Sequence, residues 1–453
     1  MKTNITTSAA RVTMLVLAAT LVACSGLLDV KNPNNVNAND LDNPAAAASI
    51  ANGALSAVAR AWGRVLTDYA TVTDELTWIG SRDGFRELDV GFLTNPTNEF
   101  LDADFPYVGE ARWLSDLAIA KLEGFRTAGT LKVADDLARS YLYGALAYAM
   151  IGDMFNNFPI ASDRQEAAPP LGSANMAQVY DTAIAYATRG LALAQGTNLR
   201  AALTATRARA RWSKVVWSKL HPVGPGVPAG GPWVNDGAVN TDAAAALGLA
   251  GTTDWKYRLA YSSSTVDNNI GAWVNSRQEM RVGNAYVNRA VTPVDTLRDP
   301  ITNAKDPEVV RALVEFKGNA ATQFYASLTV VSARELYLIL AEAALAAGDT
   351  LLNTGQFVTN INAVRALNSL TAYDVTNAAH PRPAAMLKYE RKSSLLFHGR
   401  RLHDLYRYQE RADMWQTAVP MAEAVQRPGI LFPITLVELL ANPYCVSSVA
   451  ACQ

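Results

Sequence analysis

Histidine and cysteine are scarce in this chain, which has four histidines and three cysteines among 453 residues. His398 and His403 are five positions apart, so they do not share one helix face as a zinc-binding pair of histidines must. The sequence also has no Gly-x-Ser-x-Gly motif and no glycine-rich phosphate loop. We therefore expect no metal, no cofactor and no catalytic residues.

An excess of charge of one sign is also missing. The 40 lysines and arginines nearly balance the 41 aspartates and glutamates, for a formal net charge of −1. Proteins that bind nucleic acid carry a positive footprint, and this chain has no basic block. We therefore exclude nucleic acid and polyanions as partners. Half of the residues are hydrophobic, which is enough for a large core.

The chain begins with a short apolar stretch between positive residues and a cysteine. Lys2 and Arg11 precede the stretch Val12–Ala19, which is apolar except for Thr13. This is well short of the ~20 residues that span a bilayer, so it predicts a signal peptide rather than a membrane helix. We place the signal peptide at residues 1–23. An ordinary secretory signal, followed by a cysteine by chance, is the alternative.

The residues around Cys24 resemble the lipobox of bacterial lipoproteins. Leu21, Val22 and Ala23 precede the cysteine, whose thiol would receive a diacylglycerol before cleavage, and palmitate is the expected acyl chain. Ser25 follows, and no aspartate stands there to retain the protein at the inner membrane. We predict an outer-membrane lipoprotein, anchored only by lipid at Cys24. Residues 24–44, rich in Asn, Asp and Pro from Asp29 on, would form an extended tether.

Cys445 and Cys452 are the other two cysteines. In an exported protein, two cysteines at short spacing predict a disulfide, which would close a small loop near the C-terminus. A metal-binding pair is the alternative, but no histidine lies nearby.

Apolar residues at helical spacing predict a mainly all-α domain over residues 45–453. In one such segment Ser173 is the expected N-cap, and the apolar positions run from Met176 to Leu191. The other predicted helices cover Ala48–Leu66, Pro106–Phe125, Val133–Met150, Ala201–Leu220, Ser332–Ala347, Gln356–Leu367 and Ala384–Tyr408.

Residues 221–307 differ from the rest, because proline and glycine open the segment and aromatic residues are spread among polar ones. We predict loop, a short helix and a short hairpin there.

Two distant segments share a pattern. Tyr141, Leu142, Ala145, Ala147, Gly152 and Asp153 recur at one offset as Tyr337, Leu338, Ala341, Ala343, Gly348 and Asp349. Both are alanine-rich, and we expect each helix to end at its glycine in a left-handed C-cap. Small residues at this spacing allow close helix packing, as in tetratricopeptide-like helix pairs. Coincidence between two alanine-rich helices is the alternative.

A charged segment near the C-terminus contains Glu390, Arg391, Phe397, Gly399, Arg400, Arg401, Asp404, Leu405 and Arg407. With this spacing the segment resembles the signature of the SusD/RagB family of outer-membrane nutrient-binding lipoproteins. We interpret its acidic and basic residues as ion pairs that lock helices together, with direct ligand contact as the alternative. Lys392-Ser393-Ser394 departs from the family, which more often has Arg and Glu there.

Three further segments resemble the family in the same order: Arg334–Ala343, Ile361–Arg365 and Leu431–Ile434 with Asn442-Pro443. With these the family signature extends over residues 332–443. The resemblance implies a SusD-like fold of tetratricopeptide-like helix pairs with a large loop-rich insertion. It also implies a protein at the cell surface that passes glycans or peptides to a SusC-like TonB-dependent β-barrel transporter.

Aromatic residues in loops are the candidate ligand platforms, because sugar rings stack on Trp and Tyr while nearby polar groups bind the hydroxyls. The candidates are Trp78, Arg82, Asp83, Trp233, Trp255, Trp273 and Tyr286. The alternative is that these aromatics hold loops to the helical core.

Two other functions remain open. A surface glycoside hydrolase would use an acid pair such as Asp74–Glu75 or Asp102–Asp104. An envelope scaffold would use the repeat faces to bind other proteins.

Overall fold

The computed structural model describes residues 41–162, 166–251, 253–418, 420–447 and 452. The predicted signal peptide, Cys24 and most of the tether lie outside the described residues. The chain divides into two units, residues 1–46 and residues 47–453. In the first unit the described part holds one short helical turn, η2 (Pro44–Ala46), in which the Ala46 N–H donates to the Asn43 carbonyl.

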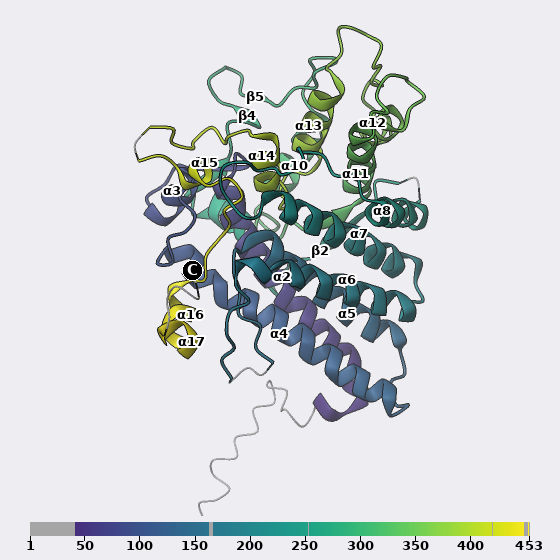
Figure 1. Ribbon diagram of the computed structural model, residues 1–453, viewed down its shortest axis with the longest axis vertical. Helices are drawn as coiled ribbons and strands as arrows, with labels where there is room; N and C mark the ends of the chain where they lie inside the picture. The colour runs from purple at the N-terminus through teal and green to yellow at the C-terminus, as the bar shows by residue number, and fades with distance from the viewer. Residues whose placement is uncertain (1–40, 163–165, 252, 419, 448–451, 453) are drawn as a thin grey trace, which may run out of the picture. The chain divides into compact units, whose positions relative to one another are not determined.

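Residues 47–453 are mainly helical, as predicted (Figure 1). The helices are α2 (Ala47–Val72), α3 (Asp83–Asp89), α4 (Glu99–Thr127), α5 (Ala134–Met154), η3 (Ser173–Asn175), α6 (Ala177–Leu193), α7 (Thr197–Leu220), α8 (Gly237–Ala250), α9 (Asn269–Gly271), the π-helix η4 (Ala272–Ser276), α10 (Pro307–Lys317), α11 (Ala333–Ala346), α12 (Gln356–Leu367), α13 (Pro383–Ser394), α14 (Arg401–Tyr408), α15 (Glu423–Gln426), α16 (Leu436–Ala441) and α17 (Pro443–Ser447).

Short strands pair antiparallel in the part of the chain that the structure describes. β1 (Leu76–Trp78) pairs with β3 (Met280–Val282), β2 (Lys256–Leu259) with β6 (Leu328–Ser332), and β4 (Val287–Asn288) with β5 (Asp295–Thr296). The β4–β5 pair is the short hairpin that the sequence predicts between residues 221 and 307. The same segment also holds α8, a longer helix than we expected there.

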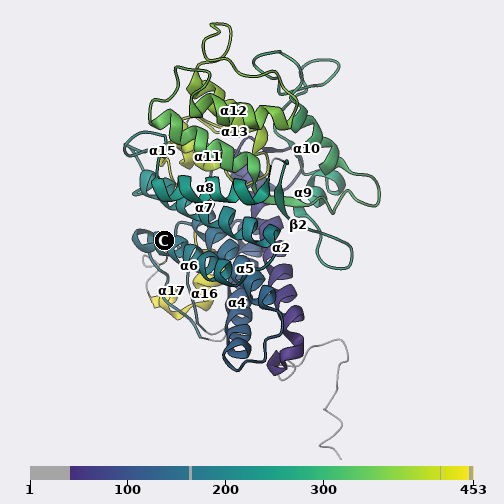
Figure 2. The same ribbon diagram turned by 90° about the vertical axis from the view of Figure 1, so that its right-hand side faces the viewer.

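The long helices pack side by side in one layered stack. Both views show the order α4, α5, α6, α7, α8 and α11, in which each helix packs against the next (Figures 1 and 2). This is the arrangement of helix pairs that the repeated alanine pattern predicts. At one end of the stack, Leu338, Phe357, Ile361 and Met386 form a core between α11, α12 and α13.

The two repeated glycines have different roles. Gly348 follows α11 with φ +78°, the predicted left-handed C-cap. Gly152 lies inside α5, which continues to Met154, so the predicted cap is wrong there. A Cβ at Gly152 would lie 2.5 Å from Cζ of Tyr180 on α6. The glycine is therefore needed because α6 packs directly against it.

Two other helix limits differ from the prediction. Ser173 starts the turn η3, and α6 begins after Met176 without a side-chain cap, so Ser173 is not its N-cap. The helix predicted over Ala384–Tyr408 is two helices, α13 and α14, joined by residues 395–400. Phe397 and Gly399 have positive φ angles in this link, which a continuous helix does not allow.

The six charged residues of the C-terminal signature all lie in buried ion pairs. Glu390 pairs with Arg365, and Arg401 with Asp74. The remaining pairs are Arg391–Asp404, Arg400–Glu335, Arg400–Asp153, Arg407–Asp404 and Arg407–Glu342.

This network joins helices from both ends of the chain. Asp153 on α5 also pairs with Arg209 on α7 at 2.7 Å. Lys392 approaches Asp74 at 3.7 Å, and among the residues that the structure describes, the buried hydroxyls of Ser393 and Ser394 find no hydrogen-bond partner.

Candidate functional site

The corner between β1 and α3 is held by one carboxylate. Glu279 accepts hydrogen bonds from the backbone N–H of Ser81 at 2.6 Å, from that of Arg82 at 3.0 Å, and from the Ser81 hydroxyl at 3.0 Å. Burial tends to raise the pKa of Glu279, but these hydrogen bonds hold it below its ordinary value. Gly80 fits here because a Cβ would lie 2.0 Å from Oε2 of Glu279. The loop is therefore fixed in one position.

Three of the predicted ligand residues meet at this corner. Trp78 is half-buried at the end of β1, and Arg82 and Asp83 are exposed at the start of α3. Arg82 lies 3.5 Å from Glu99, an ion pair with both side chains half exposed. Such a pair contributes little stability, so the guanidinium can turn toward a ligand.

Trp273 joins the same corner from the other side. Its carbonyl accepts the N–H of Glu279, and its ring packs edge-on against Phe85 and Phe100, at centroid distances of 5.0 and 5.3 Å. Trp273 is half-buried, so part of the ring remains accessible. The guanidinium of Arg277 lies 5.8 Å from the centroid of this ring.

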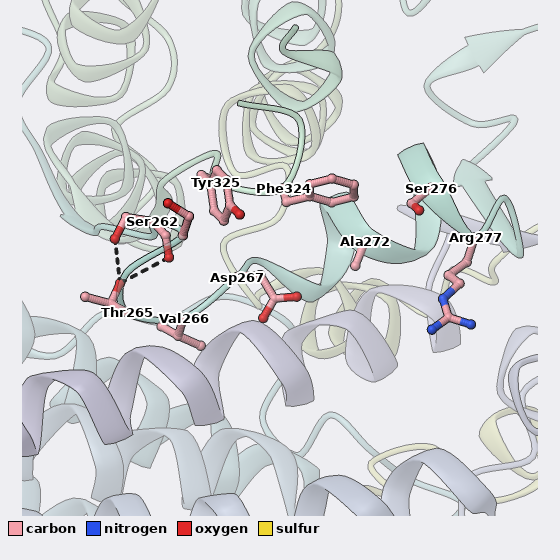
Figure 3. Close-up of a pocket in the computed structure, with 10 residues that line it drawn as sticks. Ser262, Thr265, Val266, Asp267, Ala272, Ser276, Arg277, Phe324 and Tyr325 are labelled. Carbon is pink, nitrogen blue, oxygen red and sulfur yellow. Dashed lines mark hydrogen bonds between the residues drawn. The ribbon is translucent and has the colours of Figure 1, made fainter. Parts of the chain in front are cut away.

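A polar pocket of about 390 Å³ opens beside Arg277 (Figure 3). Residues 262–267 form one side of it, the end of η4 a second, and Phe324 with Tyr325 a third. Its polar groups are hydroxyls, the carboxylate of Asp267 and the guanidinium of Arg277. A volume of this size holds a small ligand such as a few sugar rings or a short peptide.

Hydrogen bonds hold the walls of this pocket. The Ser262 hydroxyl lies 2.9 Å from that of Thr265 and closes the turn. Asn268 donates to the Ala326 carbonyl at 2.8 Å, and Asn275 donates to the Gln323 carbonyl at 2.8 Å. The pocket is therefore largely formed before any ligand binds.

The other predicted platforms lie elsewhere. Trp233 packs against Tyr408 and the core between α11, α12 and α13. The Trp255 indole donates to the side chain of Asn198 at the start of α7. The structure does not bring these two rings to Trp78 and Trp273, and each contacts the helical stack.

Tyr286 is not an exposed platform, and this prediction is wrong. Its side chain is only 1% exposed, and its ring lies 5.1 Å from the ammonium of Lys392. Burial raises the pKa of its phenol well above the ordinary value. The aromatic loop composition did not reveal that this ring belongs to the core.

The acid pairs that a hydrolase would need are engaged in structural contacts. Asp74 is ion-paired with Arg401, and burial raises the pKa of Glu75 to about 8. Asp104 pairs with Arg64, and Asp102 accepts the N–H of Val437.

No group of histidines, cysteines and acids able to hold a metal ion occurs among residues 41–162, 166–251, 253–418, 420–447 and 452. Cys445 and Cys452 are disulfide-bonded, with Cα atoms 5.5 Å apart. In this same part of the chain, no helix is long and apolar enough to cross a membrane.

The sequence did not predict the pocket between residues 262 and 325. Its lining comes from a run of Ser, Thr, Val and Asp without helical or strand period, from η4 with Arg277, and from the aromatic pair Phe324-Tyr325. The sequence does show a polar turn and, further on, a loop that contains aromatic residues. It does not show that these two segments lie next to each other in the folded protein.

Comparison with known proteins shows the fold. No family model matches the sequence, and no curated protein matches it. Among solved structures, a SusD superfamily protein from Bacteroides fragilis is similar, with a TM-score of 0.61, 14% identity, and 88% of this chain and 98% of that chain covered.

Two further structures are similar. A SusD homolog from Bacteroides thetaiotaomicron has a TM-score of 0.59 at 12% identity, with 91% of this chain and 98% of that chain covered. A SusD-like carbohydrate binding protein from Bacteroides vulgatus has a TM-score of 0.53 at 12% identity, with 81% and 84% covered. The chain therefore has the SusD superfamily fold, which the C-terminal signature predicts.

Proposed function

We propose that this protein, with its SusD superfamily fold, is a nutrient-binding lipoprotein of the outer membrane and not an enzyme. It captures a glycan or a peptide and passes it to a SusC-like TonB-dependent β-barrel transporter. The observation that supports this most is the preformed polar pocket beside the aromatic corner. One protein of the same fold is described as carbohydrate binding, which favours a glycan as the ligand.

The chemistry of the pocket suits a sugar. Phe324 and Tyr325 offer ring faces for the C–H side of a pyranose, while Asp267, Arg277 and the hydroxyls around Thr265 provide hydrogen-bond partners. Trp78, Arg82, Asp83 and Trp273 extend the proposed surface along the corner that Glu279 holds.

Calorimetry with the full chain in detergent tests the binding site. We expect saturable binding of at least one member of an oligosaccharide and peptide panel. We expect Arg277→Ala and Tyr325→Ala each to weaken it at least tenfold, because each removes a direct contact. Arg126→Ala is the control, since that half-exposed guanidinium on α4 pairs with Glu123 and does not line the polar pocket. Binding that is unchanged in both pocket variants would reject the site.

Lipid attachment at Cys24 is tested separately. We expect labelled palmitate to be incorporated into the wild-type protein and not into Cys24→Ser, which should leave the membrane fraction. Surface exposure of the wild-type protein to added protease tests the leaflet.

Purification of the membrane complex tests the partner. We expect a large β-barrel transporter to copurify with the full chain. A different envelope protein as the sole partner, with no ligand bound, would favour a scaffold. Turnover of an oligosaccharide would favour a hydrolase.

A further inference from the structure

A second and larger cavity lies away from the polar pocket. Its volume is about 660 Å³, and it lies between α4, the segment that follows α5, and α16. It shares no lining residue with the polar pocket. Most of its wall is apolar, and the rings of Phe105, Tyr107, Trp113 and Phe158 contribute to it.

The cavity is open because α4 carries a glycine where it faces the space. Gly109 lines the cavity, and a Cβ built there would meet no atom within 4 Å. Phe105 lies one helical turn before Gly109 and Trp113 one turn after it. On this face of α4, two aromatic side chains therefore flank a position without a side chain. The width of a flat ring is thus left free over Gly109.

Hydrogen bonds hold α16 as the opposite wall. The N–H of Val437 donates to the Asp102 side chain at 2.7 Å, and that of Leu436 donates to the Pro96 carbonyl at 2.8 Å. Asn442 donates to the Ala168 carbonyl at 2.8 Å. These hydrogen bonds hold α16 and the Ala168 backbone beside the start of α4.

The charges that line the cavity favour a cation. Arg112 is buried, and its charge is already paired with Asp116, because Nη1 donates to that carboxylate at 3.1 Å and to the Ala161 carbonyl at 2.6 Å. Glu438 also lines the cavity, and the one hydrogen bond described for its side chain comes from Asn442. Glu110 is 39% exposed and lies 3.6 Å from Arg60, so its carboxylate stays within reach of a ligand.

We propose that this cavity is a second binding site, which takes a small flat aromatic compound that carries a positively charged amine. The ring lies over Gly109 between the aromatic side chains, where it buries apolar surface and meets ring faces and edges. The amine is held by Glu438 and Glu110, and the aromatic faces favour its charge further.

Tryptamine is the probe, measured by calorimetry against the full chain in detergent. We expect saturable binding with one tryptamine per chain. Indole-3-propionate has the same ring with a carboxylate in place of the amine, and we expect it to bind at least tenfold more weakly. Equal binding of the two compounds, or no saturable binding of tryptamine, would overturn the proposal.

Gly109→Leu places a side chain in the cavity, where a Cβ meets no atom within 4 Å, and should weaken tryptamine binding at least tenfold. Gly124→Leu is the matched control, because Gly124 is on the same helix and a Cβ there also meets no atom within 4 Å. Both changes replace glycine by a better helix former, so neither should lower the melting temperature. Equal tryptamine affinity in the two variants would reject the cavity as the site.

Glu438→Gln tests the role of the carboxylate with little change of shape. We expect it to reduce the preference for tryptamine over indole-3-propionate at least fivefold, and an unchanged preference would contradict the assignment. The Gly109→Leu protein should still bind the oligosaccharide or peptide of the polar pocket with wild-type affinity. Failure of the second binding site can therefore be told apart from failure of the proposed nutrient site.

Discussion

The carboxylate of Asp153 is shared by two arginines in the interior. Arg209 lies 2.7 Å away and Arg400 3.3 Å away, and all three side chains are almost fully buried. Tyr180 also donates its hydroxyl to this carboxylate. Burial alone would raise the pKa of Asp153, but the two guanidinium groups lower it, so the group stays ionised. One residue thus balances charges from α7 and from the segment before α14.

Asp153→Asn should lower the free energy of unfolding by about 3–5 kcal/mol, because it leaves two buried guanidinium groups without their shared anion. Urea unfolding followed by circular dichroism measures this. Asp181→Asn is the control, since Asp181 pairs with Lys214 at a half-exposed position. That variant should lie within about 0.5 kcal/mol of wild type. A similar loss in both variants would argue against a special role of the buried pair.

Glu75 predicts a pH dependence of stability. Its pKa is raised from 4.5 to about 8 by burial, so the folded state keeps the proton that the unfolded chain releases above pH 4.5. The stability that this proton provides is complete below pH 4.5 and is lost as the pH rises through about 8. Glu75→Gln cannot ionise, and glutamine can still accept the N–H of Phe397.

We therefore expect wild type to lose a few kcal/mol of stability relative to Glu75→Gln between pH 5 and pH 9. Urea unfolding of both proteins at pH 5, 7 and 9 measures the difference. Buried histidines such as His403, whose pKa burial lowers to about 4, titrate in both proteins and cancel. A difference that does not change with pH would contradict the assignment.

For single residues, the sequence predicts the kind of interaction a side chain makes better than it predicts whether that side chain is exposed. The charged residues of the C-terminal signature form the ion pairs that the sequence predicts, because buried Arg and Asp side chains need partners of opposite charge. Trp78 and Trp273 reach one corner, whereas Tyr286 is buried, and all three occur in similar polar contexts. Exposure depends on which loop covers a ring, and that is set by contacts between residues roughly 200 positions apart, such as Trp78 and Met280.

Helix ends follow local chemistry where a cap is present. Asn98 accepts the N–H groups of Phe100 and Leu101 and starts α4 seven residues before Pro106, where we expected the helix to begin. Proline is typical of a first helical turn, which misplaced the start. Pro106 lies inside α4 and is exposed. The periodicity therefore predicted the helix correctly, but the proline led us to place its start too late.

The break between α13 and α14 could not be predicted from periodicity. Apolar and charged positions continue through residues 395–400 at helical spacing. The chain turns there because Phe397 adopts φ +59° and donates its N–H to Glu75, a residue 322 positions earlier. A tertiary contact therefore overrides the local helical preference.

Gly152→Ala should destabilise the packing of α5 against α6. Its Cβ would lie 2.5 Å from the buried ring of Tyr180, so one of the helices must shift, at a cost of about 1–3 kcal/mol. Gly53→Ala on α2 is the matched variant, because a Cβ there meets no atom within 4 Å. That substitution should raise stability by up to about 1 kcal/mol. Thermal unfolding of both variants tests whether the two changes have opposite signs.

At the scale of the whole molecule, α2 and the two residues after it are tied to α14 and the segment that follows α14. Tyr69 contacts His403, Asp74 pairs with Arg401 at 2.7 Å, and the Trp415 indole donates to the Val72 carbonyl. These contacts join segments more than 320 residues apart. Neither helix can separate without exposing buried charge.

Hydrogen exchange measured by mass spectrometry tests this coupling. Amides at the end of α2 and along α14 should exchange with the same, global free energy of unfolding. Amides of α16, which lies at the surface, should exchange at a lower free energy. Exchange of α14 well before α2 would show that the two helices open independently.

The contact between Asp74 and Arg401 also sets an order of events when the protein is made. Asp74 leaves the ribosome 327 residues before Arg401, and synthesis adds ~5–20 residues each second. For many seconds the carboxylate of Asp74 therefore lacks its Arg401 partner. The charge network of the proposed exported chain therefore cannot be complete while the chain is being made. We expect it to close only after the last quarter of the chain, which carries Arg391, Arg401 and Arg407, has crossed the membrane.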